Sequence, residues 1–231
     1  MAALRSVIPG SIVDELGGPV GPNNDKVLDN DTSKGDTKVD IYSLEANYTL
    51  GDYLLTAISS YTNENVYGAA RADDYTRTAL PLNDSNEKYQ QYTQELRITS
   101  PADATLAYVA GLYYFEKQID QDFLRYIDLY GIGFATAPDS GAISTLMDAY
   151  TTNESMAVFG QLTWNVTGRS RLSVGARYND DEITQDQTVS SLPGTLPEAP
   201  PGYINAQTSD QAISWRVIAE QDIAAAAMAY A

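Results

Sequence analysis

Hydrophobic and polar residues alternate along several stretches of this chain. From Tyr42 to Leu50 every position follows a period of two, with Tyr, Leu, Ala, Tyr and Leu on one side and Ser, Glu, Asn and Thr on the other. Successive side chains of a β-strand point to opposite faces, so this pattern predicts a strand with one apolar and one polar face. The same alternation, with few exceptions, recurs in segments 92–99, 156–166, 172–179 and 213–220.

The uncharged run ATLAYVAGLYYF at 104–115 raises the question of a membrane-spanning helix. A helix needs roughly 20 apolar residues to cross a bilayer, and this run is much shorter. Its aromatic and β-branched residues favour a strand, while Gly111 disfavours a helix. Together with segment 53–61 and a strand that begins near the end of the sequence, the pattern predicts about eight strands.

Short and long connections alternate between these strands. Gly51-Asp52 is a two-residue hairpin signal. The other short turns lie at 100–104, 166–170 and 221–225, and the long polar segments lie roughly at 63–88, 118–153 and 186–208. In an antiparallel up-and-down sheet this order gathers the tight turns at one end, as in bacterial outer-membrane barrels. The sequence therefore predicts an all-β, antiparallel up-and-down meander that is part of a transmembrane β-barrel.

Composition narrows the range of functions. The 231 residues include 14 Lys and Arg against 31 Asp and Glu, a formal net charge of −17, so nucleic acid is not expected as a partner. Histidine and cysteine are both absent, which excludes imidazole and thiolate metal sites and serine-histidine catalysis. We expect no enzyme activity and no cofactor. The 17 tyrosines suit half-wet positions, and the candidates for interfacial aromatic girdles are Tyr42, Tyr92, Tyr114, Trp164 and Tyr178.

Four segments carry a family resemblance. They read QELRITSP (94–101), AYVAGLYYFEKQ (107–118), SMAVFGQLTWNVTGRSRLSVGARYNDDE (155–182) and SWRVIAEQDIAAAAMAYA (214–231). In this order they resemble the barrel of TonB-dependent outer-membrane receptors, over about residues 36–231. The resemblance implies residence in the bacterial outer membrane, contact with its lipid, and active uptake of a scarce nutrient such as a ferric siderophore, vitamin B12 or a glycan, powered by the TonB complex.

The sequence also departs from that family. It shows no plug domain and no N-terminal segment that contacts TonB, and it ends within a predicted strand. We expect residues 1–35 to form an irregular N-terminal segment or extracellular loop, and residues 36–231 to form a partial barrel truncated at its C-terminus. A receptor fragment of this kind is not expected to transport anything by itself.

Candidate functional residues fall into two groups. The lumen-facing candidates are Glu95, Arg97, Tyr113, Gln161, Arg177 and Arg216, whose charged members suit structural ion-pair ladders better than a substrate site. The candidates for ligand contact in a long loop are Tyr126, Tyr130 and Phe134. The inner side of 107–115 is unusually apolar. Either it packs against a plug or an inward-folded loop, with Gly111 allowing close approach, or the strand simply tolerates aromatics there.

Two acidic clusters suggest chemistry at first sight. Asp29, Asp31, Ser33 and Asp40 have some of the spacing of a calcium loop, but Lys34 occupies the place of its glycine. Segment 180–182, Asp-Asp-Glu, contains neighbouring carboxylates that a hydrolase could use, but it continues a predicted strand into a loop. We interpret both as solvated acidic surface and predict no metal site.

Two other functions use similar strand patterns. A soluble β-sandwich that binds carbohydrate would show the same alternation, but its loops would not sort by length. A passive porin would have the same barrel, and only the family resemblance argues against it.

Overall fold

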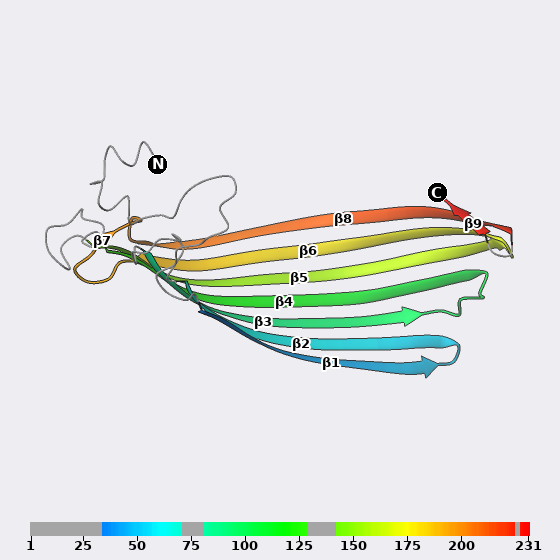
Figure 1. The fold of residues 1–231 in the computed structure, drawn as a ribbon. Coiled ribbons are helices and arrows are strands. Elements are labelled where there is room, and N and C mark those ends of the chain that lie inside the picture. The colour runs from blue at the N-terminus through cyan, green and yellow to red at the C-terminus, as the bar shows by residue number, and fades with distance from the viewer. Residues whose placement is uncertain (1–33, 71–80, 129–141, 225–226) are drawn as a thin grey trace, which may run out of the picture.

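The protein forms one antiparallel β-sheet in the computed structural model, which describes residues 34–70, 81–128, 142–224 and 227–231 (Figure 1). Its strands are β1 (Lys34–Leu50), β2 (Tyr53–Ala70), β3 (Pro81–Thr99), β4 (Leu106–Ile127), β5 (Ile143–Thr167), β6 (Ser170–Ser190), β7 (Leu196–Pro197), β8 (Gly202–Ala224) and β9 (Ala227–Tyr230). No described residue belongs to a helix that could cross a membrane.

Sheet order follows chain order, β1-β2-β3-β4-β5-β6-β8-β9, and every pair on this path is antiparallel. The predicted up-and-down meander of about eight strands is thus confirmed. Only the two-residue β7 lies off the path, parallel to the start of β5. A sandwich needs two stacked sheets, and the described residues form a single sheet.

The tight turns lie at one end of the sheet, and the strand ends between which the longer connections run lie at the other (Figure 1). Gly51 has φ of +61° between β1 and β2, a conformation that glycine adopts without steric cost. The prediction of long loops was wrong in extent. Residues 63–70, 118–127 and 143–153 belong to strands, because backbone pairing continues where both faces have become largely polar and the alternation no longer signals a strand.

One face of the sheet carries apolar side chains in register. The row through Leu112 runs across seven strands and consists of Ala46, Ala57, Leu96, Leu112, Val158, Tyr178 and Ile213. We call this row, together with the rows of Leu106, Tyr108, Ala110 and Tyr114 on the same face of β4, the apolar band. Its side chains are exposed, Leu112 by 58% and Ile213 by 72%. Water is a poor solvent for such a surface, so the band marks an interaction surface.

Three tyrosines edge the apolar band toward the longer connections. Tyr42, Tyr61 and Tyr92 are paired in register on β1, β2 and β3. Their ring centroids lie 6.3 Å apart for Tyr42–Tyr61 and 4.7 Å apart for Tyr61–Tyr92. Among the described residues the buried apolar ones are Ala142, Ala149 and Ala157, so the sheet has no conventional core. Backbone pairing and the surroundings of the two faces must hold it together.

Candidate functional site

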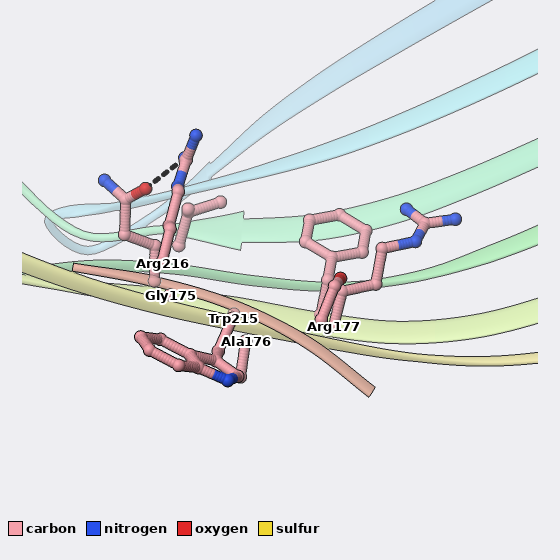
Figure 2. Close-up of a pocket in the computed structure, with 10 residues that line it drawn as sticks. Gly175, Ala176, Arg177, Trp215 and Arg216 are labelled. Atoms are coloured by element: carbon pink, nitrogen blue, oxygen red, sulfur yellow. Dashed lines mark hydrogen bonds between the residues drawn. The ribbon is translucent and has the colours of Figure 1, made fainter. Parts of the chain in front are cut away.

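The six lumen-facing candidates lie together on the face opposite the apolar band, which we call the polar face. Arg97, Gly111, Phe159 and Arg177 form one row across β3 to β6, flanked by the rows of Glu95 with Tyr113 and of Gln161 with Arg216. Figure 2 shows Arg177 and Arg216 on one side of the ribbon and Trp215 on the other. The alternation in the sequence therefore separates these residues from their neighbours correctly.

A hollow of about 370 Å³ lies among β4, β5, β6 and β8 (Figure 2). Its polar-face lining consists of Val109, Phe159, Gln161, Gly175, Arg177 and Arg216, with Ser214 beside them. Gly175 makes room for Arg216, since a Cβ there would lie 3.3 Å from Arg216 Nε and 3.4 Å from its Cγ. The arginine therefore extends across the strand instead of standing away from it.

Arg177 stacks against aromatic rings in this hollow. Its guanidinium carbon lies 5.3 Å from the ring centroid of Tyr113 and 5.8 Å from that of Phe159. Its Nε donates a 2.6 Å hydrogen bond to Asn179 Oδ1. The two cation–π contacts hold the guanidinium plane close to the polar face.

Arg216 begins a chain of polar contacts. Its Nη2 donates to Gln161 Oε1, and Gln161 Nε2 lies 3.4 Å from the hydroxyl of Thr163. Thr163 is in turn hydrogen-bonded to Ser173 at 2.8 Å. Because the amide nitrogen of Gln161 is directed at Thr163, its oxygen faces Arg216 and accepts from it.

Glu95 and Arg97 form an ion pair with 3.1 Å between Oε1 and Nη1. Their side chains are 25% and 39% exposed, so solvent screens the pair and its contribution to stability is small. At this position the structural ion-pair interpretation describes the geometry well. Arg177 and Arg216 differ, because neither has a carboxylate partner among the described residues.

Phe159 is the residue that sequence reasoning missed. It is paired with Gly111 across β4 and β5, and a Cβ on Gly111 would lie 2.5 Å from Phe159 Cζ. The ring thus covers the glycine, and packing of this face against a plug or a folded loop stays a prediction. The contact between Phe159 and Gly111 could have been predicted only by placing β4 and β5 in register.

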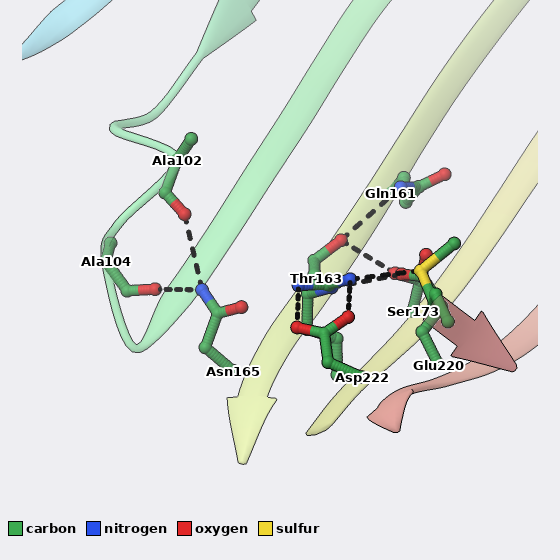
Figure 3. Close-up of polar contacts among 10 residues, drawn as sticks. Ala102, Ala104, Gln161, Thr163, Asn165, Ser173, Glu220 and Asp222 are labelled. Atoms are coloured by element: carbon green, nitrogen blue, oxygen red, sulfur yellow. Dashed lines mark hydrogen bonds and ion pairs between the residues drawn. The ribbon is translucent and has the colours of Figure 1, made fainter. Parts of the chain in front are cut away.

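A second polar cluster lies near the tight turns (Figure 3). Arg171 of β6 reaches Glu220 at 3.5 Å and Asp222 at 3.3 Å on β8. Asn165 donates hydrogen bonds to the backbone oxygens of Ala104, at 2.6 Å, and Ala102, at 3.3 Å. These contacts tie each turn to the neighbouring strand, which is a structural role.

The three residues predicted to contact a ligand from a long loop are not in one described loop. Tyr126 is in β4 rather than in a loop, and it lies an even number of residues from Leu112, on the side of the apolar band. It stands one residue before the end of a 22-residue strand whose pattern becomes polar, which is why it reads as a loop residue. Tyr130 and Phe134 lie outside the described residues, so their role stays a prediction.

At this end of the sheet, segment 192–198 lies along the first residues of β5, on the side where β6 no longer pairs with them. The hydroxyl of Ser144, which is fully buried, accepts from the amide of Leu192 at 2.8 Å and is 2.6 Å from the hydroxyl of Thr195. Glu198 lies 3.5 Å from Arg125 and accepts from the Thr145 hydroxyl at 3.1 Å. The long connection between β6 and β8 is therefore fastened across β5 to β4.

The acidic clusters do not form a catalytic or metal site in the described part of the chain. Residues 180–182 lie within β6, not at its end, so their side chains alternate between the two faces and cannot converge on one substrate. No group of three or more Asp and Glu among the described residues is arranged to hold a metal ion. Asp29, Asp31 and Ser33 lie outside them.

Neighbouring side chains shift the pKa of two carboxyl groups that lie beyond the apolar band. The pKa of the Asp186 carboxyl lies below its ordinary value because the Tyr203 hydroxyl and the Asn205 amide donate hydrogen bonds to it. The pKa of the Asp122 carboxyl lies above its ordinary value. Loss of solvation is the main cause, followed by a hydrogen bond and repulsion from Asp148 on β5.

The arrangement matches a known family. The family model described as "TonB dependent receptor-like, beta-barrel" matches residues 7–222. The chain belongs to the TonB-dependent receptor family. This is a family of outer-membrane nutrient receptors and not of enzymes, and the family resemblance in the sequence is confirmed.

Curated relatives of this TonB-dependent receptor chain include the pesticin receptors of Yersinia enterocolitica serotype O:8 / biotype 1B and of Yersinia pestis. Each is 28% identical over 159 residues, which cover 66% of this chain and 20% of the relative. The chain thus spans about a fifth of the length of the curated relatives it matches.

Solved structures share the fold. The ferric yersiniabactin uptake receptor FyuA from Yersinia pestis superimposes with a TM-score of 0.67 at 20% identity, covering 85% of this chain and 27% of that chain. The closed form of the ferric-catecholate import receptor Fiu from K12 E. coli gives a TM-score of 0.59 at 10% identity, covering 88% of this chain and 33% of that chain.

Proposed function

We propose that this chain is part of the wall of an active outer-membrane receptor, with the apolar band toward lipid and the polar face toward the barrel interior. The observation that carries the proposal is the band itself in a chain of this family. From Leu106 to Tyr114 the band has the length of about 9–11 residues that a tilted transmembrane strand requires. The row of Tyr42, Tyr61 and Tyr92 stands at its edge, where aromatic girdles meet the headgroups.

The nutrient we propose is a ferric siderophore, taken up with energy supplied through the TonB complex. Support comes from relatives whose names describe uptake of ferric yersiniabactin and of ferric catecholates. Vitamin B12 and glycans are the alternatives that the family allows.

Uptake by cells tests the proposal. We expect that deleting the gene that encodes this chain lowers accumulation of radioactive iron from ferric siderophores and leaves cobalamin uptake unchanged. A protonophore should abolish the same uptake, because the family draws energy from the proton gradient, whereas diffusion through a porin would continue. Siderophore-iron uptake that is unchanged by the deletion, or that persists with the protonophore, refutes the proposal.

We further propose that the 231 residues alone do not transport. Among the described strands β1 pairs only with β2, and β8 pairs with β6 and the short β9, so these strands do not close into a barrel. Expressing only these residues in the deletion strain should leave siderophore-iron uptake at the level of the empty vector. Restored uptake would show that the chain is competent by itself.

A further inference from the structure

Arginines of the described strands divide into two groups by their partners. Three of them have carboxylate partners: Arg97 with Glu95, Arg125 with Glu198, and Arg171 with Glu220 and Asp222. Arg177 and Arg216 line the same hollow and have no carboxylate partner among the described residues. In a chain with 31 acidic residues and a net charge of −17, two arginines at one hollow without a carboxylate partner among the described residues require an explanation.

We infer that the hollow at Arg177 and Arg216 is a carboxylate-binding site. Arg177 uses only its Nε, toward Asn179, and Arg216 uses only one Nη, toward Gln161. The other guanidinium N–H groups of both side chains make no hydrogen bond within the described part of the chain. Guanidinium forks match carboxylates with two parallel hydrogen bonds, so these free donors suit that group in particular.

The surroundings of the two arginines suit an anion. Among the described residues no Asp or Glu lines the hollow, and the hydrogen-bond partners of the two arginines are neutral amides. The two residues flank Ala176 and Trp215, which lie in the apolar band, so the site is level with that band. Arg216 is exposed and Arg177 is partly exposed on the polar face, so a ligand can reach both side chains.

The hollow also limits what can bind. Its volume of about 370 Å³ accommodates a small molecule or one acidic side chain. The ring of Phe159 forms part of the wall, which favours a carboxylate on a flat or aliphatic body. The carboxylate can come from a small ligand or from a polypeptide segment that lies against the polar face. The inference rests on the contacts of the two arginines and not on the proposed uptake, so either can fail alone.

Arginine labelling tests the site directly. The 231-residue chain in detergent micelles is treated with phenylglyoxal, which modifies free guanidinium groups, and each arginine is followed by mass spectrometry. Benzoate is the small-carboxylate probe and benzamide its neutral counterpart. We expect saturating benzoate to slow modification of Arg177 and Arg216 about tenfold. This factor corresponds to a free-energy difference of about 1.4 kcal/mol between protected and accessible guanidinium groups. Benzamide should have no effect. Arg169, in the tight turn after β5, should react equally throughout.

The peptide acetyl-Ala-Glu-Ala-amide distinguishes the sources. Protection by this peptide at lower concentration than by benzoate indicates a polypeptide partner, and the reverse order indicates a small ligand. In Arg216→Lys, which keeps the charge but loses the fork, protection of Arg177 should weaken. Equal protection by benzoate and benzamide, or equal protection of Arg169 and Arg177, overturns the inference from wild-type data alone, whether or not the variant folds.

Discussion

Gly111 offers the sharpest test of how the polar face is packed. A Cβ at this position would lie 2.5 Å from Phe159 Cζ and 2.8 Å from the backbone oxygen of Leu96. Overpacking of this kind costs about 1–3 kcal/mol. Replacing glycine by alanine returns about 0.4–1 kcal/mol, because the unfolded chain loses freedom. We therefore expect Gly111→Ala to lower the free energy of unfolding by about 1–2 kcal/mol.

Urea unfolding in micelles, followed by circular dichroism, measures this change. With a slope of about 2 kcal/mol per molar urea, the midpoint should fall by about 0.5–1 M. Gly68→Ala is the matched control, since no described residue beyond its chain neighbours has an atom within 4 Å of the Cβ that it would add. In the double variant with Phe159→Ala the effect should shrink but not vanish, because the oxygen of Leu96 stays in place. A midpoint for Gly111→Ala at or above that of Gly68→Ala refutes the packing described for Phe159.

Three further predictions are also measured by urea unfolding. Ile213→Arg on the apolar band should destabilise by about 2–4 kcal/mol in lipid vesicles, while Ala212→Arg on the polar face should change little, and equal effects would contradict the assignment of the faces. The raised pKa of the Asp122 carboxyl opposite Asp148 means that its protonated form stabilises the fold at low pH and that this stability is lost as pH rises through the raised value. Asp122→Asn should therefore unfold at higher urea than wild type at pH 7 but not at pH 3, and a gain at both pH values would point to another cause. Asn165→Ala removes two hydrogen bonds to the 100–105 turn and should cost about 1–2 kcal/mol, with no loss counting against a role for this turn contact.

The sequence predicts best where one face is apolar and the other polar. In segments such as 42–50 the alternation fixes both the strand and the side on which each residue lies, so the faces of Arg177 and Arg216 could be derived before any coordinates. The strict alternation of short and long connections also places the tight turns at one end of the sheet. These features depend on local periodicity alone.

Other features depend on pairing, which a single sequence does not display. The contact of Phe159 with Gly111 joins residues 48 positions apart, and it follows only from the register of β4 and β5. The outer halves of the strands carry polar residues on both faces, so Tyr126 reads as a loop residue although backbone hydrogen bonds keep it in β4. The alternation of apolar and polar residues no longer predicts a strand where both sides of the sheet face the same solvent.

The length of the strands bears on how a receptor of this kind can handle its ligand. Gly111 lies in the row of Arg177, and Ile127, at the end of β4, is 16 residues further along the strand. At about 3.3 Å per residue this is about 50 Å along the strand. A siderophore-sized ligand cannot touch both places at once. If the rim and the arginine hollow both take part in the proposed uptake, they act at different stages or on different partners, and substitutions at the two places should combine additively in uptake.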